Sequence, residues 1–205
     1  MTAAVRILGA ALCFSGIAVA AVYLAQERWV DVAVLMLVGL GQVLCFLLLR
    51  TGWARGVCSL VLLTAGVSAA QLLYERIAYW DLAIHFLATG VLALLWRALR
   101  LRRRPARSQG PSAQRPALEA AGTRRRVAAS ALVGLILALV WEAMELVGFL
   151  LVSPEIHIPP ADTASDVVVG VLGAALVGLL RPPPRAPGGR PAAARGSTAH
   201  AERRD

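Results

Sequence analysis

The chain has 205 residues, of which 58% are apolar and 16% are charged, whereas ordinary soluble domains are roughly 45–50% apolar and about 25% charged. This composition argues against a soluble globular enzyme, a disordered chain and a collagenous chain. The formal net charge is +9, and every basic residue is an arginine. Cys13, Cys45 and Cys58 stand singly in apolar runs, which excludes a disulfide-stapled scaffold and is typical of small buried apolar side chains.

Six stretches are long and apolar enough for bilayer-spanning helices, each of which needs about 20 mostly apolar residues. They predict an all-α polytopic membrane bundle with six transmembrane helices that occupies residues 1–180. The first apolar run is longer than the roughly 7–15 residues of a signal-peptide core, so we expect it to be retained as a helix. The expected spans are 5–25, 30–49, 53–73, 80–99, 127–152 and 162–180.

Two polar segments interrupt or follow these spans. The connection 100–126 carries Arg runs at 102–104 and 124–126 around a middle of Pro, Ser, Gln, Gly and Ala. The tail 181–205 is similar, with three consecutive prolines and scattered Arg. Segments of this composition cannot bury a hydrophobic core, so both are expected to be disordered.

The positions of the arginines predict the orientation. With six spans, 19 of the 21 Arg residues fall on the side of the two termini, and only Arg28 and Arg76 fall on the other. Because cytoplasmic loops collect basic residues, both termini are expected in the cytoplasm. The Arg runs would contact anionic lipid head groups. The segment 100–126 has no aromatic residue, so we expect no nucleic-acid partner.

Acidic residues gather toward the opposite, outer side. There, three polar pairs each share a helix face through i,i+3 or i,i+4 spacing. From a rise of about 1.5 Å per residue, the first member of the span-five pair lies deepest, and His85, Glu145 and Asp166 are expected at similar depth. The three pairs are Asp81 with His85, Glu142 with Glu145, and Asp162 with Asp166.

Small residues share the faces that carry these acids in the last two spans. Because small side chains allow membrane helices to approach closely, we expect spans five and six to pack through these stripes. The stripe on span five includes Gly134, Ala138 and Gly148, and the stripe on span six includes Gly170, Gly173 and Val177.

One histidine among several carboxylates permits three kinds of chemistry. A divalent metal would be bound by His85, Glu142, Glu145 and Asp166, because imidazole and carboxylate ligate Zn, Mn or Fe. Crowded carboxylates can also share protons, and the polar head of a lipid could occupy the same space.

Structural roles compete with these for several residues. Asp81 and Asp162 suit helix caps, and His85 could simply form a hydrogen bond between helices. His157 fits an exposed outer loop, and Trp80 and Trp141 are interpreted as interface or packing aromatics. Glu142 and Glu145 are the hardest to explain structurally, because burying a carboxylate in a membrane is costly.

The ordered set of motifs resembles the YjdF-type family of bacterial inner-membrane proteins and is more distantly similar to VanZ-like proteins. The resemblance covers roughly residues 78–180. It implies a small polytopic protein without an established activity, and the VanZ-like relatives are associated with glycopeptide resistance. The matching positions are Asp81, His85, Glu142, Glu145, Asp162 and Asp166, in the segments Trp80-Asp81, His85-Phe86, Trp141-Glu142 and Asp162-Thr163.

Three hypotheses for the function follow. In the first, the outward-facing His and carboxylate site performs metal-dependent chemistry on a lipid or envelope substrate, or binds it. In the second, the acids bind protons or a cation in a transporter or accessory protein, although no inverted repeat or broken helix pair is evident in the sequence. In the third, the acids only hold helices together. The residues leave open whether the protein is an enzyme.

Overall fold

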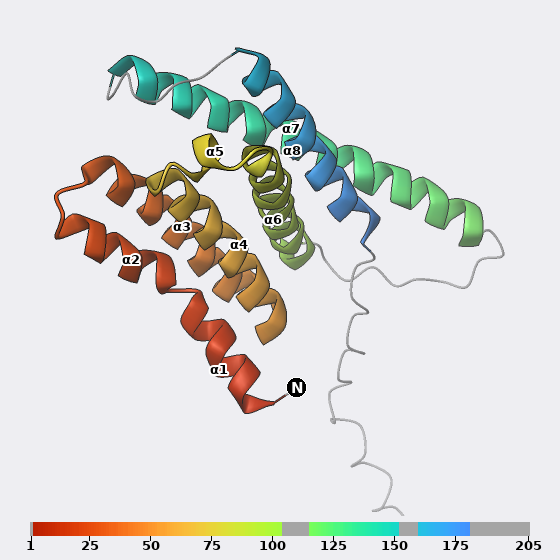
Figure 1. Ribbon diagram of the computed structural model, residues 1–205. Coiled ribbons are helices and arrows are strands. Elements are labelled where there is room, and N and C mark those ends of the chain that lie inside the picture. The colour runs from red at the N-terminus through yellow and green to blue at the C-terminus, as the bar shows by residue number, and fades with distance from the viewer. Residues whose placement is uncertain (1, 104–114, 152–159, 181–205) are drawn as a thin grey trace, which may run out of the picture.

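The computed structural model describes residues 2–103, 115–151 and 160–180, and all of their regular structure is helical (Figure 1). Six stretches are long and apolar enough to cross a membrane, with α1 and α2 together forming the first. The expected all-α architecture with six candidate membrane-spanning helices is therefore confirmed. The helices are α1 (Ala3–Leu12), α2 (Ser15–Leu24), α3 (Trp29–Leu48), α4 (Gly52–Ala70), α5 (Leu73–Arg76), α6 (Trp80–Arg103), α7 (Arg115–Leu151) and α8 (Pro160–Leu179).

Helix α6 lies between two groups of helices, with α1–α4 on one side and α7 and α8 on the other (Figure 1). Helix α8 packs against both α6 and α7. Glycine makes these contacts close: a Cβ on Gly134 would lie 2.4 Å from the Cβ of Ala174, and a Cβ on Gly170 would lie 3.5 Å from that of Ala138. The two small-residue stripes thus meet as expected, except that Gly173 faces α6.

The outer surface of the bundle is strongly apolar. Many large hydrophobic side chains that face away from the core stay more than half exposed, such as Leu40 (57%), Leu132 (58%) and Leu151 (80%). In water, a surface of this kind would be unstable or would associate. Lipid contact removes that cost, as expected for a membrane protein.

The first span differs from the single helix expected over residues 5–25. Helix α1 ends at Leu12 and α2 begins at Ser15. At the break, side chains take over from helical hydrogen bonds. The backbone N–H of Gly16 donates to the side-chain oxygen of Gln42 at 2.7 Å, and the Ser15 hydroxyl donates to the Leu12 carbonyl at 2.8 Å. A break within a membrane helix is tolerated where neighbouring side chains satisfy the freed backbone groups.

The ends of the connection 100–126, expected to be disordered, are helical. Helix α6 continues to Arg103, and α7 already begins at Arg115. Arg, Ala, Leu and Glu are strong helix formers, and Pro116 lies in the first turn of α7, where proline is tolerated. His157 and the tail 181–205 lie outside the described residues.

The three cysteines, which stand far apart in the sequence, belong to one buried cluster. Cys13, Cys45 and Cys58 pack with Leu62 and Leu95 between α1, α3, α4 and α6. All three thiols are free. The cluster anchors α6 to the N-terminal helices, and α6 in turn carries part of the site described next.

Candidate functional site

Two helices bring an imidazole and two carboxylates together. Asp81 and His85 lie one turn apart at the start of α6, and Asp166 comes from the first half of α8. The Nε2 atom of His85 lies 3.3 Å from an Asp81 oxygen and 4.0 Å from an Asp166 oxygen. One ligand atom from each residue lies within 4.8 Å of the other two. We call Asp81, His85 and Asp166 the acid–histidine triad.

The contact between α6 and α8 explains why Asp166 reaches His85. A Cβ on Gly173 would lie 2.0 Å from the backbone oxygen of Phe86, so the two backbones approach as closely as glycine permits. One turn nearer the triad, a Cβ on Gly170 would lie 3.0 Å from the Thr89 hydroxyl. This short distance between the helices places Asp166 opposite His85, where both side chains are buried.

Helix α7 contributes further acids to the same end of the bundle. Glu142 is only 8% exposed, and neither of its carboxylate oxygens has a hydrogen-bond partner among the described residues. Glu145 accepts a hydrogen bond of 2.7 Å from the Trp141 indole, whose ring lies edge-on to His85 at 6.3 Å between centroids. Glu145 also interacts electrostatically with His85, Asp81 and Glu142.

The residues within ligand distance differ from the metal-binding set expected from the sequence. Asp81 joins His85 and Asp166, whereas Glu142 and Glu145 are outside this group. The physical reason is side-chain direction: Asp81 lies one turn from His85 on the same face of α6, while the Glu145 carboxylate points to the indole of its own helix. Glu142 is nevertheless close enough to Asp166 for an electrostatic interaction.

One residue of the expected candidate site lies apart from the triad, and one residue that was not expected lies near it. Asp162 is exposed at the start of α8 and is not part of the triad. Tyr74, in α5, was not anticipated. Burial raises the pKa of its phenol, and the carboxylates of Asp81, Glu145 and Asp166 raise it further. Its hydroxyl donates to the Ala65 carbonyl at 2.9 Å. A tyrosine between two spans has no spacing signal, so only the fold reveals the influence of the acids on it.

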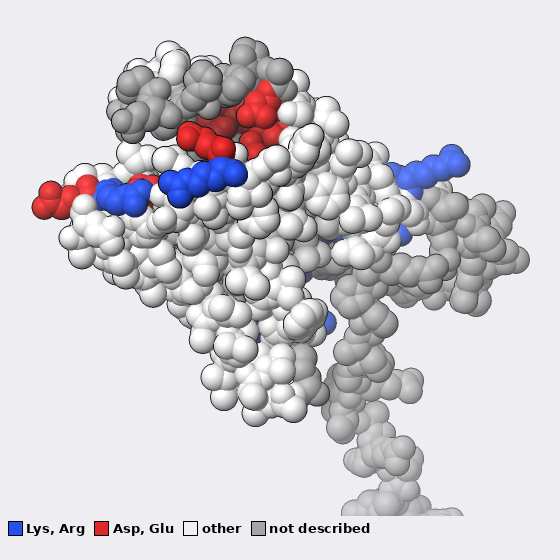
Figure 2. Space-filling model, viewed as in Figure 1, with Lys and Arg blue, Asp and Glu red and all other residues white. Residues whose placement is uncertain are grey.

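The triad acids and the α7 glutamates form no ion pair with an arginine among the described residues, although Arg side chains lie close to the acidic cluster in Figure 2. Figure 2 shows acidic side chains gathered at the end of the bundle where α5 and the first turn of α6 lie in Figure 1. Arg28 pairs instead with Asp31, at 2.6 Å. One imidazole can offset one carboxylate only, so the cluster favours binding a cation or protons.

The spacing of the triad suits a small divalent ion. A tetrahedral metal with bonds of about 2.1 Å holds its ligand atoms roughly 3.4 Å apart. His85 Nε2 lies 3.3 Å from an Asp81 oxygen and 4.0 Å from an Asp166 oxygen, and the ligand atoms of the triad lie within 4.8 Å of one another. Asp166 has a second oxygen that is buried and unpartnered among the described residues, as are both oxygens of Glu142. These oxygens could complete the coordination of an ion or hold protons.

The comparisons with known proteins place the chain in a family without assigning a reaction. No curated protein and no solved structure matches the chain. A family model described as "Predicted membrane protein (DUF2238)" matches residues 2–181. That match covers all six candidate spans and the whole acid–histidine triad. The chain therefore belongs to the DUF2238 family of predicted membrane proteins.

Proposed function

We propose that this membrane protein binds a divalent metal at its outward-facing end and uses it to bind, or act on, the polar part of a lipid or another envelope substrate. The observation that carries the proposal is the triad of Asp81, His85 and Asp166, whose ligand atoms lie within 4.8 Å of one another. The chain would lie in a bacterial cytoplasmic membrane with both termini inside. The likeness of residues 78–180 to YjdF-type and VanZ-like proteins supports an envelope role.

Buried, unpartnered carboxylate oxygens support the metal over a purely structural network. Asp166 is 4% exposed and Glu142 is 8% exposed, and three of their four oxygens have no hydrogen-bond partner among the described residues. A network that only joined helices would pair these oxygens, because an unpaired buried charge is strongly destabilising. A bound cation supplies both the missing charge and the missing partners.

Metal content tests this proposal directly. The protein is purified in detergent, dialysed against metal-free buffer and analysed by inductively coupled plasma mass spectrometry. We expect stoichiometric metal in the wild type and in Asp162→Asn, which removes an exposed acid from the same helix. His85→Ala and Asp166→Asn should weaken metal affinity by about 100-fold or more, because loss of even a supporting residue costs about 10–100-fold.

Thermal unfolding separates loss of metal from loss of fold. A chelator should lower the unfolding temperature of the wild type and of Asp162→Asn, and added metal should restore it, since a ligand that binds only the folded state stabilises it. The two triad variants should not respond to either treatment. A wild-type protein that holds no stoichiometric metal and ignores chelator would rule out the metal.

A second candidate is a proton-coupled transporter or accessory protein. It is favoured by the contacts of His85, whose Nε2 already approaches both Asp81 and Asp166 as a protonated imidazole would. In that case, purified protein in proteoliposomes should carry a proton-dependent flux that Glu142→Gln abolishes. Unchanged phenotypes for Glu142→Gln and Glu145→Gln, with reduced stability alone, would instead support a structural network.

A further inference from the structure

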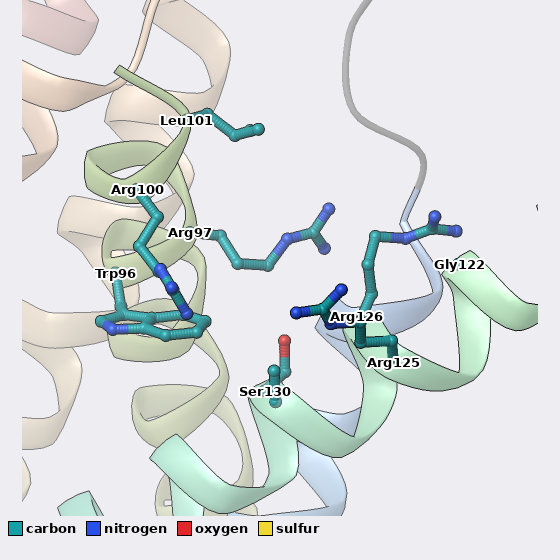
Figure 3. Close-up of a pocket in the computed structure, with 9 residues that line it drawn as sticks. Trp96, Arg97, Arg100, Leu101, Gly122, Arg125, Arg126 and Ser130 are labelled. Atoms are coloured by element: carbon teal, nitrogen blue, oxygen red, sulfur yellow. The ribbon is translucent and has the colours of Figure 1, made fainter. Parts of the chain in front are cut away.

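A cavity of about 350 Å³ lies between α6 and α7, at the end of the bundle opposite the triad. Along α6, Arg97 is 16 residues beyond Asp81, or about 24 Å at 1.5 Å per residue. In Figure 3, the Arg97 side chain extends from α6 toward α7, and the Ser130 hydroxyl points into the space between the two helices. The volume is at the lower end of the roughly 300–1,000 Å³ typical of small-molecule sites.

The lining of this cavity is strongly cationic. It includes Arg97 and Arg100 from α6 and Arg125 and Arg126 from α7, and no acidic side chain among the described residues lines it. Arg97 and Arg126 interact electrostatically as like charges. Arg100 and Arg125 are exposed and Arg97 and Arg126 are half-buried, and a cleft lined by four like charges concentrates a positive potential that attracts an anion.

Two buried polar groups in the lining lack partners. Ser130 has no exposed surface, and its hydroxyl has no hydrogen-bond partner among the described residues. The same is true of the Nε atom of Arg126, whose terminal nitrogen donates to the Thr123 hydroxyl at 2.7 Å. A buried serine hydroxyl without a partner is costly. Both donors would be satisfied by the oxygens of a single bound anion.

Neighbouring contacts hold two of the arginines in place. Arg97 donates to the backbone carbonyls of Val177 and Leu180 at the end of α8, the latter at 2.8 Å. The guanidinium of Arg100 stacks on the Trp96 ring, 4.9 Å from its centroid. Stacking pre-organises Arg100 for bidentate recognition of a phosphate, whereas Arg97, whose two terminal nitrogens already donate to these carbonyls, contributes only its charge.

From this arrangement we propose that the cavity binds a phosphate group, contributed by an anionic phospholipid head or by a soluble phosphate compound. The guanidinium groups of Arg100, Arg125 and Arg126 supply charge and paired donors, and the Ser130 hydroxyl donates to a phosphate oxygen. Trp96 provides an apolar wall for the group attached to the phosphate. This site is distinct from the triad. It is a defined binding site for one phosphate, in contrast to the general contact with lipid head groups expected of the Arg runs.

Native mass spectrometry of the full-length protein in nanodiscs tests the proposal. One set of discs contains phosphatidylcholine with phosphatidylglycerol, and a second contains phosphatidylcholine with inorganic phosphate added to the buffer. Arg126→Gln and Ser130→Ala are compared with Arg124→Gln, which removes the same charge from an exposed position outside the cavity. Circular dichroism of each variant reports whether the fold is retained, and Ser130→Ala guards against failure of the arginine variant to fold.

We expect one tightly retained phosphatidylglycerol or phosphate in the wild type and in Arg124→Gln. Arg126→Gln should reduce its affinity at least about tenfold, because it removes a charge-assisted contact, and Ser130→Ala should reduce it less but measurably. Retention of phosphatidylglycerol only assigns the lipid, and retention of inorganic phosphate assigns a soluble compound. Equal losses in Arg124→Gln and Arg126→Gln, or no retained anion in either disc, would overturn the proposal.

Discussion

Gln42 connects three helices at the break in the first span. Its side-chain oxygen accepts from the Gly16 N–H at 2.7 Å, and its side-chain nitrogen donates to the Ser15 hydroxyl and the Ser59 carbonyl, both at 3.0 Å. The residue has no exposed surface. A single amide therefore satisfies the freed N–H at the start of α2 and joins this helix to α3 and α4.

Replacing Gln42 by Leu should destabilise the protein by about 1–3 kcal/mol, because the Gly16 N–H is left buried without a partner. The measurement is reversible unfolding in detergent, followed by circular dichroism. Gln71→Leu is the matched control, since Gln71 is exposed at the end of α4 and bonds only one side chain, that of Tyr23. Equal destabilisation by the two changes would argue against a special role for Gln42.

Spacing in the sequence was sufficient to find the polar pairs but not to decide which of them meet. Asp81 and His85 share a face in any helix, so their contact follows from local geometry alone. The approach of Asp166 depends on the distance between two helices, and the direction of Glu145 depends on the indole of Trp141. Such contacts are set by packing between segments, which no local pattern reports.

At the scale of the helices, the contact between α6 and α8 determines the geometry of the triad. Gly173 touches the backbone of Phe86, the residue next to His85. At the other end of the same pair of helices, Arg97 donates to the last carbonyls of α8. The two helices are thus fixed at both ends, and any change in their separation moves Asp166 relative to His85.

Gly173→Ala should force α6 and α8 apart, because the new Cβ would lie 2.0 Å from the backbone oxygen of Phe86. Overpacking of this kind costs about 1–3 kcal/mol, and we expect metal retention to fall along with stability. Gly90→Ala is the control at the same contact, since its Cβ would lie 3.4 Å from the Gly173 oxygen, an ordinary contact. The measurements are thermal unfolding and metal content of both variants. Similar results for the two variants would contradict this role of Gly173.

The sequence predicted the helices whose existence depends on the length of an apolar run. It did not predict a helix boundary that depends on a side chain from another helix. Six apolar runs of about the right length predict six spans without further information. The break after Leu12 contains no proline, and its one local signal, the Ser15-Gly16 pair, is weak; the group that satisfies the freed Gly16 N–H, Gln42, comes from α3. Helix α7 begins at Arg115 because Ala, Leu, Glu and Arg, which are strong helix formers, predominate in its polar first turns, although their polarity suggested a loop.

At the scale of the whole molecule, charge is divided between the two ends of the bundle. The triad and the α7 glutamates lie at one end, and the arginine-lined cavity lies at the other. The positive-inside rule predicts that the arginine end faces the cytoplasm and that the triad opens to the outside. This orientation is what makes an envelope substrate, rather than a cytoplasmic one, the expected partner of the triad.

Cysteine labelling in intact bacteria tests this orientation. The native thiols give little background, because Cys13 and Cys45 are fully buried and Cys58 is only 6% exposed. Glu75→Cys in α5 should react with a membrane-impermeant maleimide added to whole cells. Arg103→Cys, equally exposed at the end of α6, should react only after lysis. The reverse labelling pattern would indicate that the triad faces the cytoplasm, and its substrate would then be sought among soluble metabolites. The metal and phosphate proposals would stand in either case, because they rest on local contacts.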